Sequence, residues 1–182
     1  MRKNIILGIT AGVAIYKSCS LARALIKQGH LVKVVMTPNA AKLISPILFE
    51  SLTGEKVYVE MFQAQREYSI EHIGLAKWAD LVLVVPASAN TIAKLANGIC
   101  DNLLTTLILA LAKKTPVIIA CAMNTNMWDN PITQRNLTLL KKTVNYKIIN
   151  PAKGDLACGD KGQGALAALE DILKEIKLAF KK

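Results

Sequence analysis

The chain has 182 residues, of which 52% are hydrophobic and 20% charged, and its formal net charge is +10. This balance predicts one globular domain with a sizeable core and excludes a disordered chain. The longest apolar stretch, 103–112, is shorter than the roughly 20 residues that cross a bilayer, so we expect no membrane segment. Polar residues and a glycine interrupt the apolar run near the N-terminus, which argues against a secretory signal peptide.

The positive charges are dispersed along the chain, mostly near the ends of predicted helices, where cations interact favourably with the helix dipole. No basic run is interleaved with aromatic residues, so we expect no nucleic-acid partner, whereas an anionic small molecule is compatible with the charge. The four cysteines form no C-x-x-C pair and no zinc-spaced cluster with histidine. We therefore predict reduced thiols, a cytoplasmic protein and no metal site.

Short apolar runs alternate with longer amphipathic segments. The apolar runs predict strands at 5–9, 31–36, 81–85, 117–120 and 146–149, and the amphipathic segments predict helices at 14–28, 91–96, 102–114, 131–142 and 169–180. Almost continuous apolar runs are typical of parallel strands that are buried on both faces. Their alternation with helices predicts an α/β fold in one domain, 1–182: a doubly wound, Rossmann-like parallel sheet in the flavodoxin-like three-layer arrangement, with helices on both faces. We expect long loops at 37–65 and 150–164.

Ligands of such sheets bind at the carboxyl ends of the strands. The first strand leads into Gly8-Ile9-Thr10-Ala11-Gly12-Val13-Ala14, where small residues permit close approach to the backbone and the next helix offers N–H donors to a phosphate. The segment lacks the G-x-G-x-x-G pattern, and the second strand ends in Met36-Thr37-Pro38-Asn39, without an acidic residue for a dinucleotide ribose. A mononucleotide phosphate is thus favoured over NAD; the alternative is a tight turn without a ligand.

Polar side chains also follow the third and fourth strands. The third is followed by Ser88-Ala89-Asn90-Thr91, in which Ser88 and Asn90 can each cap the next helix, or bind a phosphate or a polar ring. The fourth is followed by Ala122-Met123-Asn124-Thr125-Asn126-Met127-Trp128. The Asn124 amide can bind a carboxylate or another amide, although the segment can also be only the entry to a helix.

His72 and Cys158 are the candidates for acid–base chemistry. His72 precedes a short amphipathic helix, and its imidazole can act as a base near neutral pH, although a lone histidine is more often a surface or core residue. Three glycines follow Cys158 closely, which predicts a flexible flap, and a thiol in an exposed loop is a better candidate for reactivity than one on a helix. Cys19 and Cys100 fit helix packing, whereas Cys121 ends a strand.

Taken together and in this order, these segments resemble the flavin-dependent cysteine decarboxylases. The likeness covers essentially the whole chain and is carried by 8–14, Glu71-His72-Ile73, 78–80, 86–91, 100–105, 122–128 and Ala157-Cys158-Gly159-Asp160. Within the family, the chain is most similar to the branch that converts phosphopantothenoylcysteine to phosphopantetheine in coenzyme A biosynthesis. One departure is Cys121, where relatives commonly have a proline that would make this loop more rigid.

The resemblance implies a lyase with FMN as its cofactor and a phosphorylated small molecule as its substrate. FMN would lie against 10–14, with Thr37 and 88–91 near its phosphate and ribityl chain. The family's route passes through a thioaldehyde and an enethiolate without net redox change, so no nicotinamide is required. Its enzymes form trimers with FMN near subunit contacts, and we therefore expect a homotrimer or a higher multiple.

The resemblance also implies roles for residues on the substrate side. His72 corresponds to the active-site base, and Asn124 to the residue that binds the substrate carboxylate, with Ala122 and Met123 beside it. Cys158 corresponds to the acid on a flap that covers the substrate. Bacterial relatives are often fused to a synthetase domain, so we expect that activity on another chain.

Three other activities share parts of this pattern. A peptidyl-cysteine decarboxylase would share the flavin, His72 and Asn124, but Cys158-Gly159-Asp160 favours the coenzyme A branch. A flavin prenyltransferase would not be expected to carry His72 and 122–128. Relatives that regulate a protein phosphatase without catalysis commonly have a long acidic tail or lack a catalytic residue, and this chain has neither feature.

Overall fold

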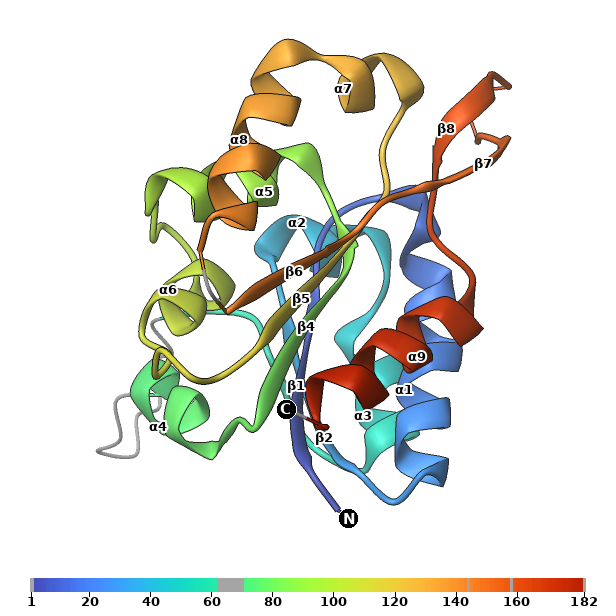
Figure 1. Ribbon diagram of the computed structural model, residues 1–182. Helices are drawn as coiled ribbons and strands as arrows, with labels where there is room; N and C mark the ends of the chain where they lie inside the picture. Colours follow the sequence, from blue (N-terminus) through green and yellow to red (C-terminus); the bar gives the residue numbers. More distant parts are fainter. Residues whose placement is uncertain (1, 62–70, 144, 158, 182) are drawn as a thin grey trace.

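The structure is a computed structural model, and it describes residues 2–61, 71–143, 145–157 and 159–181. Its centre is a six-stranded parallel sheet with the order β3-β2-β1-β4-β5-β6 (Figure 1). The strands are β1 (Asn4–Ile9), β2 (Leu31–Met36), β3 (Val57–Tyr58), β4 (Leu81–Ala87), β5 (Val117–Cys121) and β6 (Tyr146–Ile149). Without the two-residue edge strand β3, the order is the flavodoxin-like order of a doubly wound sheet, as predicted.

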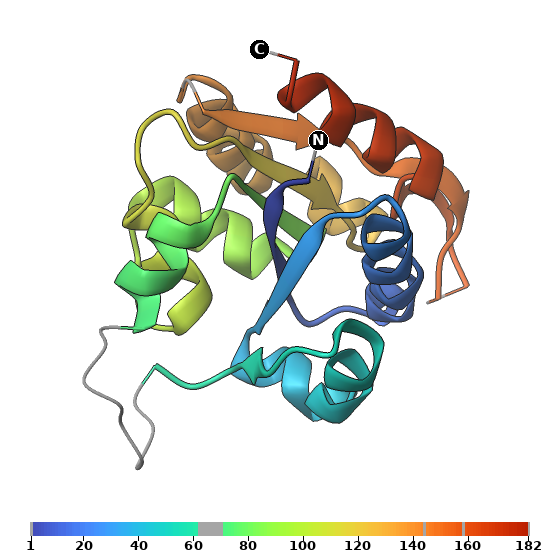
Figure 2. The ribbon, with the colours of Figure 1, turned by 90° about the horizontal axis from the view of Figure 1, so that it is seen from below.

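Two layers of helices cover the sheet, and Figure 2 shows them on either side of it. One layer packs on one hydrophobic cluster and comprises α1 (Lys17–Lys27), α2 (Pro38–Leu43), α3 (Pro46–Thr53) and α9 (Leu169–Ala179). The other packs on a second cluster and comprises α4 (Glu71–Trp78), α5 (Ala89–Asn97), α6 (Leu103–Leu109) and α8 (Pro131–Lys141). Because both faces are covered, every residue of β4 and β5 is buried, which explains their continuous apolar runs.

The predicted loop at 37–65 is wrong in its first part, since α2, α3 and β3 occupy it. Both helices have a proline in the first turn and follow a hydroxyl residue, Thr37 or Ser45, which is the usual signal for a helix start. Their lengths of 6 and 8 residues are too short for a clear apolar period, so hydrophobic periodicity alone does not predict them.

Several other boundaries also differ from the prediction, and three of them have a clear cause or consequence. The helix expected at 14–28 begins as a 3₁₀ turn, η1 (Val13–Tyr16), that runs into α1. The helix expected at 102–114 ends at Leu109, because the chain must turn back to enter β5, and this turn overrides the helix propensity of the next residues. Strand β4 continues through Pro86 to Ala87, where its register with β5 shifts.

The predicted flap at 150–164 is a β-hairpin. It consists of β7 (Ala152–Asp155) and β8 (Lys161–Ala165), which pair antiparallel in a separate two-stranded sheet. The hairpin projects from the carboxyl side of the central sheet beside α7 (Thr125–Asp129), as Figure 1 shows. Four consecutive exposed residues in β7 account for the missing hydrophobic pattern.

Candidate active site

The carboxyl ends of β1 and β4 form the centre of the candidate site. These strands are neighbours in the sheet, yet β1 leads into α1 on one layer and β4 into α5 on the other. Such a change of side between neighbouring strands is where α/β sheets generally bind ligands. The Thr10 hydroxyl joins the two loops: it donates to the Pro86 carbonyl at 2.7 Å and accepts from the Ser88 N–H at 3.0 Å. Thr10 is only 1% exposed, so its hydroxyl is used within the fold.

The structure brings all but one of the predicted cofactor-binding residues to one edge of the sheet. The N–H of Thr37, directly after β2, donates to the Ile9 carbonyl at 2.9 Å, so this loop lies next to the one after β1. The Thr37 hydroxyl accepts from the Ala40 N–H at 3.3 Å and caps α2. The polar edge therefore comprises the segment Thr10, Ala11, Gly12 and Val13, the segment Ser88, Ala89, Asn90 and Thr91, and Thr37. Gly8 is not part of it, since this residue is buried inside β1 and faces the side chain of Leu104 in α6.

In the loop after β4, one of the two candidate residues caps the next helix. The Ser88 hydroxyl accepts from the Thr91 N–H at 3.4 Å, so Ser88 is the cap of α5. Asn90 lies inside the first turn of the helix, with its side chain exposed. Thr91 is 2% exposed, and its hydroxyl accepts from that of Ser88 at 3.3 Å. Asn90 is thus the most accessible of these polar side chains.

Asn124 stands at the carboxyl end of β5. Its Oδ1 accepts from the Asn126 N–H at 2.9 Å and caps α7, which fixes the orientation of the amide. Its Nδ2 donates to Oδ2 of Asp160, in the turn of the hairpin, at 3.1 Å. The backbone before it is held on both sides, since the Ala122 N–H donates to Ala87 at the end of β4 and the Met123 N–H donates to Gly164 in β8.

Two glycines let the hairpin lie against this segment. A Cβ on Gly164 would stand 2.2 Å from the Met123 carbonyl oxygen, and a Cβ on Gly162 would stand 2.4 Å from the Thr125 hydroxyl. Both separations are far below van der Waals contact. At Gly164 the nearest atom belongs to the backbone, so the packing requires glycine there, whereas a side chain at position 162 would force the Thr125 side chain to move. Cys158, the predicted acid, lies outside the described residues.

His72 is not near Asn124 within one chain. It lies inside α4, near the start of the helix rather than before it, and its side chain is half-buried. Helix α4 packs beside α6 and ends at Trp78, whose carbonyl accepts from the side chain of Asn4 at the start of β1. Figure 1 shows α4 low on the flank of the sheet and α7 above its carboxyl end, so the two elements lie apart.

Cys121 lies at the site but is closed off from it. Its side chain is fully buried at the end of β5, and this burial raises the pKa of the thiol to about 12. The positive charge of Lys141 acts weakly in the opposite direction. At neutral pH the thiol is therefore protonated, and a protonated, buried thiol is a poor nucleophile.

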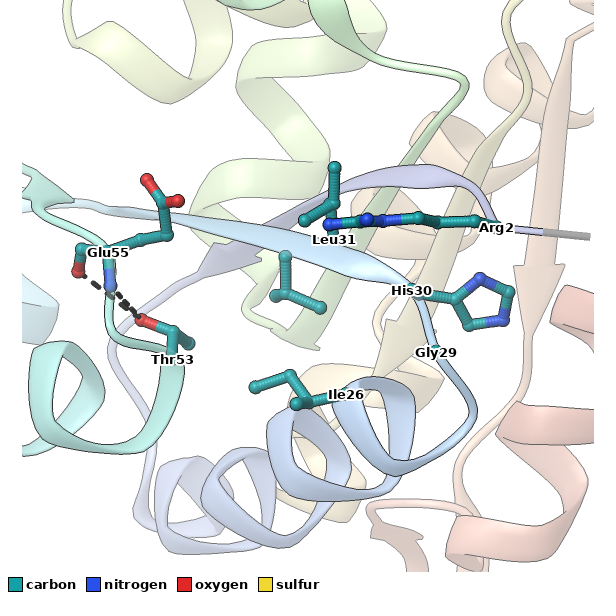
Figure 3. Close-up of a pocket in the computed structure, with 8 residues that line it drawn as sticks. Arg2, Ile26, Gly29, His30, Leu31, Thr53 and Glu55 are labelled. Carbon is teal, nitrogen blue, oxygen red and sulfur yellow. Dashed lines mark hydrogen bonds between the residues drawn. The ribbon is translucent and has the colours of Figure 1, made fainter.

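A cavity of about 360 Å³ lies at the opposite, amino end of the strands (Figure 3). It is lined by Arg2, Ile26, Gly29, His30, Leu31, Val32, Thr53 and Glu55. Burial, together with positive charge that includes Lys3, lowers the pKa of His30, whose ring packs 6.0 Å from that of Phe180. Since the cavity contains none of the predicted site residues, it is a separate feature of the surface.

Two contacts at the polar edge had no signal in the sequence pattern. Asp160 was part of a resembling segment, but nothing local predicts that its carboxylate meets Asn124 across 36 residues. Lys94 and Asp101 form an ion pair at 2.6 Å beside the start of α6, and the Lys94 hydrogen bond lowers the pKa of Asp101. The first contact joins the loop after β5 to the hairpin after β6, and the second joins α5 to the loop that follows it, so the side-chain contacts become visible only in the three-dimensional fold.

Comparison with known proteins places this arrangement among flavin-binding proteins. The family model described as Flavoprotein matches residues 1–181. A Streptococcus mutans protein named as a probable phosphopantothenoylcysteine decarboxylase is 46% identical over 177 residues, which cover 97% of this chain and 98% of that protein. The Bacillus subtilis coenzyme A biosynthesis bifunctional protein CoaBC is 45% identical over 172 residues, which are 94% of this chain but only 42% of that protein. The chain thus spans less than half the length of this bifunctional relative.

Two solved structures show the same fold. A mutant PPC decarboxylase complexed with pantothenoylaminoethenethiol has a TM-score of 0.88 and 31% identity, with 100% of both chains covered. The FMN-binding protein AtHal3 has a TM-score of 0.83 and 32% identity, with 98% of this chain and 97% of that chain covered.

Proposed function

The chain belongs to the flavoprotein family, and from this premise we propose that it is a carboxy-lyase that uses FMN to decarboxylate phosphopantothenoylcysteine to phosphopantetheine. One structural observation carries the proposal. Asn124 presents a fixed amide at the end of β5, beneath a hairpin and next to a cluster of loops suited to a phosphate. Likeness to the Streptococcus mutans protein over nearly its whole length supports the same activity.

The loops at the carboxyl edge fit a flavin mononucleotide. Gly12 has open space, since the nearest atom to a Cβ there would be 3.9 Å away, so a ligand can approach its backbone. The continuous helical segment of η1 and α1 begins there and favours a phosphate at its N-terminus. Because the hydroxyls of Thr10 and Thr37 are used within the fold, we expect backbone N–H groups and the accessible Asn90 to supply most polar contacts.

Bound FMN would supply the two-electron chemistry that makes the substrate carboxylate a leaving group. On the substrate side, Nδ2 of Asn124 is the donor that this chain offers to the carboxylate. The hairpin beside it would exclude water from the reacting carbon. His72 as base and Cys158 as acid stay predictions, the latter at a residue outside the described part of the chain.

The homotrimer, or a higher multiple, stays a prediction. It is supported by the distance between α4, which carries His72, and α7, which Asn124 caps, since a second subunit could bring these elements together (Figure 1). Large apolar side chains exposed on η1, α2 and α3 are Val13, Tyr16, Leu43, Ile47 and Leu48, and they offer surface for such contacts. No helix in the described part of the chain is long and apolar enough to cross a membrane. The cytoplasmic location also stays a prediction.

The role of Asn124 can be tested with a matched pair of variants. We expect Asn124→Leu to lose at least about a hundredfold in kcat/KM for phosphopantothenoylcysteine, because the substrate carboxylate would be left without its polar partner. Asn126→Ala should retain activity, since Asn126 is exposed on the same helix and contributes its backbone N–H to the cap. Equal activity of the two variants would exclude Asn124 from the site. A peptide ending in cysteine, assayed in parallel, tests the peptidyl-cysteine alternative.

A further inference from the structure

We propose that the Asp160 carboxylate competes with the substrate carboxylate for Asn124 and moves away from Asn124 when substrate binds. The inference rests on the proposed function and deepens it. Its basis is that the Asn124 Nδ2, the predicted donor to the substrate, already donates to the Asp160 carboxylate at 3.1 Å. Asp160 thus presents to Asn124 the same chemical group that the substrate would bring.

The base of the hairpin fixes where Asp160 can lie. The Met123 N–H donates to the Gly164 carbonyl at 3.0 Å, immediately before Asn124 in the chain. The close approach of Gly162 to Thr125 holds β8 on the other side of Asn124. Residues 123–125 and the strand that follows Asp160 are therefore packed together, and the carboxylate reaches Asn124 from a defined direction.

The turn of the hairpin is also ordered by its own backbone. The Leu156 N–H donates to the Asp160 carbonyl at 2.8 Å, and the Gly159 N–H donates to the Leu156 carbonyl at 2.9 Å. The first of these bonds uses the backbone carbonyl of Asp160, while its side-chain carboxylate accepts from Asn124. Gly159 has a φ of 88°, which a residue with a side chain adopts only at a cost, so glycine favours this closed turn.

For electrostatic reasons, the carboxylates of Asp160 and of the substrate cannot bind Asn124 at the same time. Two negative groups within a few ångströms of one amide repel each other. The Asn124 amide cannot turn its Nδ2 away from Asp160 without releasing the cap of α7, because its Oδ1 accepts from the Asn126 N–H. Binding of a substrate carboxylate therefore requires Asp160 to move away. The decarboxylated product has no such group, so the return of Asp160 to Asn124 would favour its release.

The test compares two unreactive ligands on the FMN-loaded protein. One is phosphopantothenoylserine, which keeps the carboxylate, and the other is phosphopantothenoyl ethanolamine, which lacks it; both carry a hydroxyl in place of the thiol. We expect Asp160→Ala to bind the first ligand about fivefold more tightly, because the binding-competent state no longer competes with the internal contact. Binding of the second ligand should be unchanged or weaker, since it does not displace Asp160.

Asp155→Ala is the matched control, because Asp155 lies in the same hairpin, is 82% exposed at its side chain and pairs with Lys161. It should leave the affinity ratio of the two ligands unchanged. A purely structural role of Asp160 would weaken both ligands, and a role in orienting Asn124 for the substrate would weaken the first ligand; either result overturns the proposal. If neither ligand binds the unmodified protein, the proposed function fails instead, so the two failures are distinguishable.

Discussion

At the scale of single residues, the polar groups at the strand ends mainly build the loops. The Thr10 hydroxyl joins the loops after β1 and β4, the Thr37 hydroxyl caps α2, and the Ser88 hydroxyl caps α5. Buried polar groups must find partners, so residues that sequence reasoning assigned to the cofactor also have a structural task. Their direct contact with FMN stays a prediction.

The Thr10 hydroxyl can be removed with little change in shape by Thr10→Val. Because both of its hydrogen bonds link the two loops, we expect a loss of about 1–3 kcal/mol in the free energy of unfolding and weaker retention of FMN. Urea denaturation and the flavin absorbance of the purified protein measure the two effects. Thr138→Val, on the exposed face of α8, is the control and should change neither. Equal stability of the two variants would contradict the linking role.

The high pKa of Cys121, about 12, predicts a thiol that resists alkylation in the folded protein. At pH 8, iodoacetamide should modify the half-buried Cys100 in the folded protein, and Cys121 only after unfolding in urea, as peptide masses would show. The pH effect on stability has a definite sign. Because the pKa of Cys121 in the folded protein lies above the ordinary value of 9.0, burial of the protonated thiol contributes fully to the free energy of unfolding below pH 9. This contribution is lost as the pH rises toward 12. Rapid labelling of Cys121 in the native state would contradict this account.

At the scale of helices and strands, the apolar periodicity predicted the central sheet because each strand is buried on both faces. The strand runs at 31–36 and 146–149 matched β2 and β6 at both ends. The missed elements, α2, α3 and the β7–β8 hairpin, are short or exposed, so their stability comes from caps and tertiary packing rather than from a hydrophobic pattern. The same holds for the candidate site. The predicted strand ends located its loops, whereas the contact between Asn124 and Asp160 could be seen only in the three-dimensional structure.

The packing of the β7–β8 hairpin against residues 123–125 can be tested with two glycine substitutions. Gly164→Ala should displace the hairpin, because the new Cβ would stand 2.2 Å from a backbone oxygen that cannot rotate away. We expect a loss of about 1–3 kcal/mol in stability and a larger loss of decarboxylase activity. Gly154→Ala, in the facing strand, adds a Cβ no closer than 3.9 Å to its neighbours and should be tolerated. If both variants behave alike, the docking of the hairpin is not required for activity.

At the scale of the whole molecule, α4 and α7 lie apart, so one chain does not bring His72 and Asn124 together. If the proposed function holds, a single chain therefore has an incomplete site. A closed oligomer would solve this by pairing His72 of one subunit with Asn124 of another. Such an arrangement would also explain why the chain leaves large apolar side chains exposed on η1, α2 and α3.

Shared sites can be detected by mixing two inactive variants. If His72→Asn and Asn124→Leu are unfolded together in equal amounts and refolded, about a quarter of the sites would contain both intact residues. We expect the mixture to regain a corresponding part of the activity, measured as phosphopantetheine formed, while each variant refolded alone stays inactive. Absence of recovery, with oligomers present by light scattering, would indicate that each chain holds a complete site.

The most direct test of the central claim is the mass of the product formed from phosphopantothenoylcysteine by the purified, flavin-loaded protein. The account predicts loss of carbon dioxide to give phosphopantetheine, without any nicotinamide, and no product from Asn124→Leu. A protein that retains its flavin but leaves the substrate mass unchanged would contradict the assignment.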